Sequence, residues 1–66
     1  MKDAKRSVVE RFLRGQGYAV ARDSGNHTFW AKPGHRSIPL PRHGTISPKV
    51  LRDIEKAVGF VPAEWK

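Results

Sequence analysis

The sequence predicts a small two-layer α+β domain with the element order α-β-β-β-α. Two segments, one toward each end of the chain, carry apolar residues at helical spacing. Between them lie three short segments of strand-like composition, separated by clusters of turn residues. We expect an antiparallel sheet of three strands, with both helices on one face and the other face left open.

The first helix is expected over residues 3–15. Gly15 and Gly17 end it, because glycine adopts the left-handed conformation of a helix C-cap without strain. The apolar residues share one side of this helix: Val8, Val9, Phe12 and Leu13.

The second helix has clear capping signals. Ser47 is a favoured N-cap residue, Pro48 suits the first helical position, and Gly59 ends the helix. The apolar stripe consists of Val50, Leu51, Ile54, Ala57 and Val58. In the short tail that follows, residues 60–66, two aromatic side chains are expected to pack back onto the core: Phe60 and Trp65.

Three segments have the pattern of strands: residues 18–22, 27–32 and 36–40. Between the first two, Gly25 and Asn26 suit a primed hairpin turn, because glycine supplies a positive φ. Pro39 has no N–H to donate to a ladder, so the third strand is expected at the sheet edge.

Alternation along the second strand places Phe29 and Trp30 on opposite faces of the sheet. We expect Phe29 in the core and Trp30 on the open face, where an indole can stack on a base. His27 shares the side of Phe29, so we expect it at the mouth of the strand, beyond the cover of the helices.

The composition limits the class of protein. A chain of 66 residues holds one domain, residues 1–66, and without cysteine it has neither a disulfide nor a thiolate metal site. No apolar run of secretory length follows the basic N-terminus, and no stretch reaches the roughly 20 apolar residues that span a bilayer. We therefore expect a cytoplasmic protein that does not bind a membrane.

Positive charge is the strongest compositional signal. Thirteen Lys and Arg residues against six Asp and Glu residues give a net charge of +7 and a pI near 10.6. Such an excess attracts polyanions, and nucleic acid is the first candidate.

Several basic side chains are candidates to contact RNA phosphates. Three of them follow one side of the second helix, opposite its apolar stripe: Lys49, Arg52 and Lys56. Lys49 also lies in the first turn, where backbone N–H groups favour an anion. An ordinary solvated helix face, interrupted by acidic residues, remains an alternative. Lys32 and Arg42 are the other candidates to hold a phosphate.

His27 directly follows the Gly25-Asn26 turn and is the candidate catalytic residue. An imidazole takes or gives a proton at neutral pH, and RNA cleavage without a metal needs such a base and acid. A structural or surface role for His27 stays open. His43 is either a second acid/base or a loop contact, and His35 is expected to be exposed without a role. The histidine spacing fits no zinc site, so no metal or other cofactor is expected.

The sequence resembles the HicA family of bacterial toxins, from about Val8 to Gly59. Gly25-Asn26-His27 is similar to the Gly-Ser-His of that family and differs from it in Asn26. The remaining matching pieces are Pro33-Gly34, Ile38-Pro39-Leu40-Pro41-Arg42-His43, and Leu51-Arg52-x-Ile54 with the closing Gly59.

This resemblance implies a helix-sheet-helix fold and a ribonuclease that cuts messenger RNA without a required metal. It also implies His27 as the catalytic residue and a HicB-like antitoxin as the protein partner. If the family's serine hydroxyl assists the reaction, Asn26 alters the activity.

Two other functions remain open from the residues alone. One is a non-catalytic module that binds double-stranded RNA, since the order and length of the predicted elements resemble the double-stranded RNA-binding domain. That family places a Gly-Pro-x-His loop between its first two strands, whereas here the Gly–His spacing is shorter and the proline is absent. The other is an interaction protein whose basic face meets an acidic partner.

Overall fold

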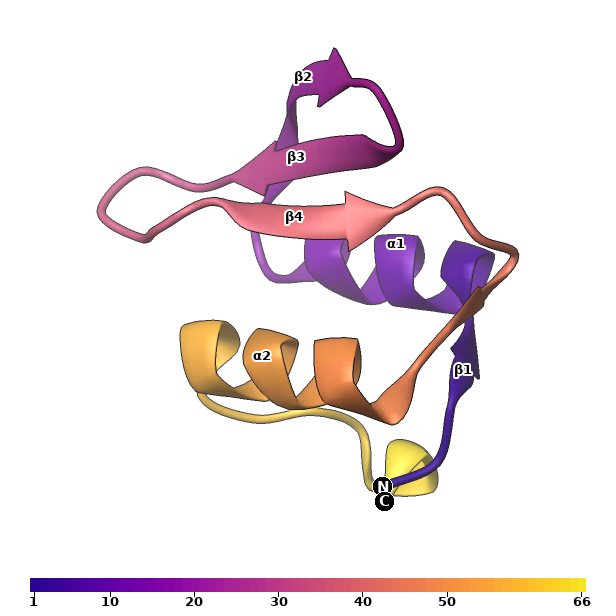
Figure 1. The fold of residues 1–66 in the computed structure, drawn as a ribbon. Helices are drawn as coiled ribbons and strands as arrows, with labels where there is room; N and C mark the ends of the chain where they lie inside the picture. Colours follow the sequence, from indigo (N-terminus) through magenta and orange to yellow (C-terminus); the bar gives the residue numbers. More distant parts are fainter.

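The computed structural model describes residues 1–66 and confirms the predicted α+β class. The elements in chain order are β1 (Ala4–Lys5), α1 (Arg6–Gly15), β2 (Ala19–Ser24), β3 (His27–Ala31), β4 (Ile38–Pro41), β5 (Thr45–Ile46), α2 (Pro48–Val58) and a short 3₁₀ helix, η1 (Ala63–Trp65). Both helices lie on the same side of the β2–β3–β4 sheet (Figure 1). Neither helix has the length and apolar character that crossing a membrane requires.

The main sheet is an antiparallel meander with β3 in the centre. β4 therefore forms an edge, as Pro39 predicted. The register of β2 is interrupted by a bulge between Val20 and Arg22, and this strand is exposed along its whole length. The limits of the three strands differ from the predicted segments by at most two residues, because strand ends are poorly encoded in local composition.

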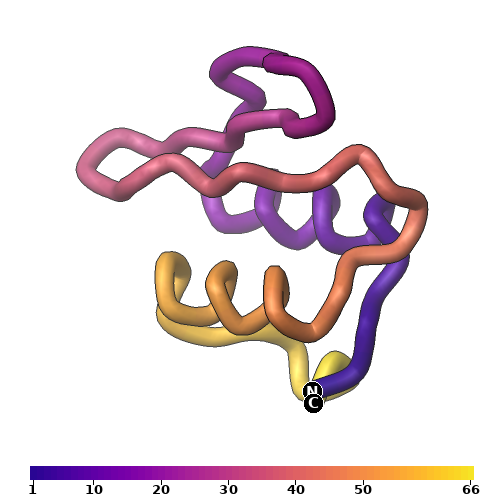
Figure 2. The backbone as a smooth tube through the Cα atoms, in the orientation of Figure 1, coloured from indigo at the N-terminus to yellow at the C-terminus, as the bar shows by residue number.

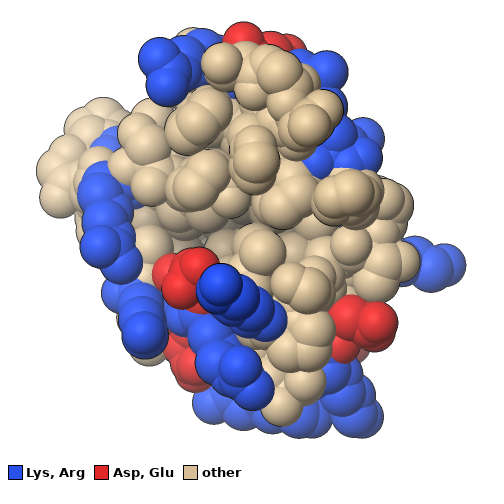
Figure 3. Space-filling view, in the orientation of Figure 1, with Lys and Arg blue, Asp and Glu red and all other residues tan.

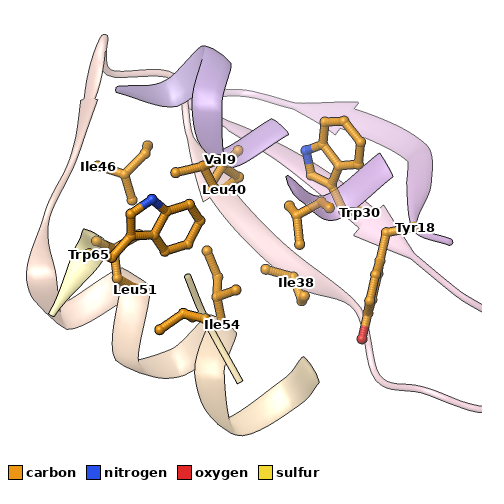
Figure 4. Close-up of a cluster of buried hydrophobic side chains, with 11 residues drawn as sticks. Val9, Tyr18, Trp30, Ile38, Leu40, Ile46, Leu51, Ile54 and Trp65 are labelled. Carbon is orange, nitrogen blue, oxygen red and sulfur yellow. The ribbon is translucent and has the colours of Figure 1, made fainter. Parts of the chain in front are cut away.

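One hydrophobic cluster joins the helices to the sheet. Trp30, Ile38 and Leu40 point from β3 and β4 toward the helices, and Val9 and Ile54 face them from α1 and α2 (Figure 4). The buried residues of this cluster are Val9, Leu13, Tyr18, Trp30, Ile38, Leu40, Ile46, Leu51, Ile54, Val61 and Trp65.

The expected placement of the two neighbouring aromatic residues of β3 is wrong. Trp30 is fully buried, with an exposed fraction of 0%, and the half-buried Phe29 lies on the open face. Alternation holds, but the faces are exchanged. The register pairs Trp30 with Ile38, so the larger aromatic side chain fills the core between sheet and helices, where it removes more apolar area from water.

The N-terminus also differs from its prediction. α1 begins at Arg6 rather than at residue 3, because Ala4 and Lys5 pair with Ile46 and Thr45 in a separate two-stranded sheet. The Arg6 N–H continues this connection by donating to the Gly44 carbonyl at 2.9 Å. These long-range hydrogen bonds override the helical pattern of the first residues.

The tail returns to the core as predicted for Trp65, which is buried. Its ring packs against Phe12 with 5.1 Å between the centroids, and its carbonyl accepts a hydrogen bond from the Lys2 N–H. The two ends of the chain consequently lie side by side (Figure 2). Phe60 contacts the edge of Phe12 but stays 50% exposed.

The limits of α2 follow its capping residues. Ser47 is the N-cap residue and Pro48 begins the helix, although the Ser47 side chain makes no capping hydrogen bond. Gly59 ends the helix with a φ of 106°, and its N–H donates to the Glu55 carbonyl. This left-handed conformation is the reason that glycine is favoured there.

A pair of substitutions tests which aromatic residue of β3 holds the core. Trp30→Ala should lower the free energy of unfolding by about 3–5 kcal/mol, and Phe29→Ala, which removes a half-buried ring, by about 1 kcal/mol. Urea unfolding followed by circular dichroism measures both. If Trp30→Ala does not fold, Trp30→Phe provides the comparison; an equal or greater loss in Phe29→Ala would contradict the assignment of the faces.

Candidate functional site

A two-residue turn positions His27. Ser24 and His27 pair across the hairpin, and Gly25 and Asn26 connect them. Gly25 has a φ of 57° while Asn26 has none in the positive range, the combination found in type II′ hairpin turns. The Asn26 carbonyl accepts a hydrogen bond of 3.0 Å from the Arg42 N–H, which attaches the turn to the end of β4.

The His27 side chain projects from the open face of the sheet. The register aligns Ser24, His27 and Pro41 in one row and Arg22, Phe29 and Pro39 in the next. These two rows alternate with the rows that contain Leu40 and Trp30, which face the helices. Neither open-face row contains an acidic residue. The His27 side chain is exposed and has no hydrogen-bond partner within the protein.

His27, Phe29 and Arg22 form a cluster on this face. The Phe29 ring neighbours both other residues, and the Arg22 guanidinium carbon lies 4.5 Å from its centroid, a distance typical of a cation–π contact. The centroids of the His27 and Phe29 rings are 6.4 Å apart. An imidazole, an aromatic ring and a fixed positive charge are therefore neighbours on a flat surface.

Arg22 and Phe29 are not among the site residues expected from the sequence. A signal was present: counting outward from a two-residue Gly25-Asn26 turn pairs Arg22 with Phe29. What composition did not reveal was which face of β3 the helices cover.

A polar network lies on the other side of the sheet at the same end. Arg42 pairs with Asp23, with 2.8 Å between Nη2 and Oδ1, and the Thr28 hydroxyl donates to the same oxygen at 2.9 Å. Asp23 and Thr28 are paired in register on the face opposite to His27. This network links β2, β3 and the end of β4 behind the turn that carries His27.

The network lowers the pKa of the Asp23 carboxyl. The hydrogen bond from Thr28 is the largest cause, partial desolvation acts in the opposite direction, and the charge and hydrogen bond of Arg42 lower the pKa further. Arg42 thus has its guanidinium engaged with a carboxylate, although its side chain is 45% exposed.

The predicted phosphate contacts fall into separate places. Arg42 and His43 directly follow Pro41, the residue paired with His27, and both are exposed. Lys32 lies beyond the other end of β3, about 16 Å along the strand from His27. Its Nζ atom is 5.8 Å from the centroid of the Tyr18 ring. The structure therefore brings Arg42 and His43, but not Lys32, to the end of the sheet that carries His27.

The basic row of α2 is on the opposite side of the molecule. Lys49, Arg52 and Lys56 are exposed, whereas Leu51 and Ile54 of the same helix are buried. At helical spacing the three basic residues point away from the core and so away from the sheet. The row and the His27 face are thus on opposite sides of a two-layer domain and do not form one continuous site.

The buried Trp30 corrects one further prediction. With its side chain enclosed by the core, Trp30 does not lie on the surface that was expected to stack on a base. Its neighbour Phe29 occupies the open-face position instead. His35 is exposed, as expected, and the centroids of the His35 and Tyr18 rings are 6.0 Å apart.

The molecular surface is basic overall, with a net charge of +7. It contains no pocket, and no three His, Asp or Glu side chains gather as metal ligands. In the view of Figure 3, Lys and Arg side chains are spread around the margin, while uncharged residues cover the centre. The acidic side chains are far fewer, in keeping with the net charge of +7.

Fold and site together define a small basic α+β protein with an exposed imidazole on an open sheet face. The family model described as HicA toxin of bacterial toxin-antitoxin matches residues 6–60. The chain belongs to the HicA toxin family, as its sequence resemblance predicted. Members of this family are toxins of toxin–antitoxin systems that generally act as ribonucleases on mRNA. No curated protein and no solved structure gives a significant match to the chain.

The Asp23 network predicts a loss of stability in acid. Because the pKa of Asp23 is lower in the folded chain, its stabilising effect is full above the ordinary aspartate pKa and disappears as the pH falls through the folded pKa. Asp23→Asn should therefore unfold at lower urea than the native chain near neutral pH, and this difference should shrink toward about pH 3.

Urea titrations at several pH values measure this effect. Asp53→Asn is the control, since Asp53 is exposed and forms no ion pair. A difference between native chain and Asp23→Asn that stays constant from neutral to acid pH would contradict the role given to the carboxylate.

Proposed function

We propose that the protein is an mRNA-cleaving endoribonuclease toxin in which His27 transfers a proton to or from the RNA. The observation that carries this proposal is the placement of His27 on an exposed sheet face without acidic residues, beside Phe29 and Arg22. A long polyanion reaches such a face without entering a pocket. The membership in the HicA family supports the substrate and the reaction.

The proposed reaction uses the ribose of the RNA as nucleophile. The 2′-oxygen attacks the adjacent phosphorus, and the bond between phosphorus and the 5′-oxygen breaks. One proton leaves the 2′-hydroxyl and one reaches the departing 5′-oxygen, so the products are a 2′,3′-cyclic phosphate and a 5′-hydroxyl. The His27 imidazole performs one of these transfers.

The other transfer and the phosphate charge are assigned to the same end of the sheet. His43 follows two residues after Pro41, which is paired with His27, and is the candidate for the second proton transfer. Arg22 is the positive group on the His27 face, and such a cation stabilises charge that develops on a phosphate. Arg42, the other predicted phosphate contact at this end, reaches a phosphate only by leaving its ion pair with Asp23. This scheme needs no metal ion.

A cognate antitoxin of the HicB type is the proposed protein partner. An acidic protein that covers the open face blocks access to His27 and neutralises the basic surroundings. Since its proposed substrate is mRNA, the toxin acts in the cytoplasm.

The basic row of α2 is proposed as a second contact with RNA phosphates. Lys49, Arg52 and Lys56 lie away from His27, so they hold the RNA beyond the scissile bond rather than take part in cleavage. Lys32, also distant from His27, belongs to the same class of contact.

Replacement of His27 tests the catalytic assignment. His27→Ala should lower the cleavage rate by about 100- to 10,000-fold and abolish toxicity on expression, with an unchanged circular dichroism spectrum because the side chain is exposed. Cleavage of a labelled RNA in the presence of EDTA measures the rate. The native chain should remain active in EDTA, and a 2′-deoxy substitution at the cut should block the reaction.

The matched control is His35→Ala, which removes an exposed imidazole at the far end of the sheet and should leave the rate unchanged. A His27→Ala protein that cuts RNA at the native rate would contradict the assignment of His27 as the catalytic residue. Native protein that shifts duplex RNA in a gel without producing fragments would instead identify a non-catalytic RNA-binding module.

Neutralising the α2 row should weaken RNA binding without changing the chemical step. We consider a protein in which Lys49, Arg52 and Lys56 are all replaced by Gln. The slope of log affinity against log salt concentration should become shallower by about 2, because each phosphate contact on a single strand contributes about 0.7 to that slope. Single-turnover cleavage at saturating RNA should keep its native rate. An unchanged salt slope would show that the row is an ordinary solvated helix face.

A further inference from the structure

Phe29 occupies an unusual place for a large apolar side chain. The core is complete without it, since Trp30 fills the space between sheet and helices, yet Phe29 stands on the face that no helix covers. Its neighbours in the row are Arg22 and Pro39, both exposed. The half-buried ring therefore leaves part of its surface open to solvent in the middle of the open sheet face.

The Arg22 guanidinium adds a second flat group to this surface. It lies 4.5 Å from the centroid of Phe29, and no acidic side chain is paired with it. Aromatic rings and guanidinium planes are the two kinds of protein group on which unpaired bases stack. A guanidinium that stacks in this way also keeps N–H groups free for a phosphate.

We propose that Phe29 and Arg22 form a nucleobase platform that seats an unpaired base of the RNA next to the phosphodiester at His27. This inference rests on the proposed ribonuclease function. The centroid of the His27 ring is 6.4 Å from that of Phe29, so a base on the platform brings its own ribose and phosphate to the imidazole. The platform thus positions the scissile phosphodiester bond next to the His27 imidazole.

The chemistry of the face selects single-stranded RNA as the occupant. A base within a duplex is already stacked and paired, so it does not reach a platform on a flat sheet. The rows around His27 and Phe29 contain Arg22 and no carboxylate, which suits a phosphate backbone. Asp23, the acidic residue nearest in sequence, is held on the other face by Thr28 and Arg42.

The binding test uses a His27→Ala background, so that the RNA stays intact. A short fluorescein-labelled single-stranded RNA is titrated with this protein and with His27→Ala/Phe29→Ala, and fluorescence anisotropy gives the affinity. Loss of the ring should weaken binding by about 5- to 150-fold, the range for removal of one stacked base. Phe29→Trp should restore the affinity, and Arg22→Lys, which keeps the charge but not the plane, should lose part of it.

Abasic RNAs identify the base that occupies the platform. An abasic nucleotide at one position should weaken binding to the Phe29-containing protein but have little further effect on the Phe29→Ala protein, because the contact is already absent. Abasic nucleotides elsewhere should affect both proteins equally. In the chain with native His27, the sensitive position should adjoin the mapped cut.

Phe60→Ala provides the matched control, since Phe60 is an exposed phenylalanine that packs on Phe12 away from the sheet face. RNA affinity unchanged by Phe29→Ala would overturn the inference, as would equal losses of affinity at every abasic position in both proteins. Lost antitoxin binding with unchanged RNA binding would also overturn it and assign the face to the protein partner. The ribonuclease proposal fails separately, if His27→Ala still cleaves.

Discussion

Burial of Trp30 is the constraint on which the rest of the structure depends. Neighbouring residues of a strand point to opposite faces, so the burial of this indole in the hydrophobic core directs Phe29 and His27 outward. The same choice, carried through the register of the hairpin, sends Arg22 to the open face and Asp23 to the other. The burial of Trp30 thus places the groups suited to RNA on one face of the sheet and the carboxylate that would repel RNA on the other.

The fold was largely predictable because its signals are local. Helical spacing, the Ser47–Pro48 start and the Gly59 end of α2 depend on residues near one another in sequence, and so does the turn at Gly25. The pairing of β1 with β5 was not predictable, since two residues at each site carry no pattern and the hydrogen bonds join distant parts of the chain. The faces of β3 were misassigned for a related reason: two adjacent aromatic residues satisfy alternation in either orientation.

The candidate site was predicted at its centre and not in its surroundings. The turn placed His27 at the start of β3, but basic residues were judged by their type, and type does not specify which side of the domain a side chain occupies. Lys49 and its companions on α2 consequently lie across the domain from His27. Arg42 is at the correct end of the sheet, but its guanidinium is engaged with Asp23, an ion pair between strands that no local pattern indicates.

The two edges of the sheet determine whether its uncovered face stays accessible to a binding partner. On β4, Pro39 and Pro41 offer no N–H to an incoming strand, and on β2 the bulge after Val20 breaks the regular spacing of donors and acceptors. Both edges are therefore poor templates for strand addition. Copies of the chain are discouraged from joining edge to edge into larger sheets, and the flat surface between the edges stays free for side-chain recognition.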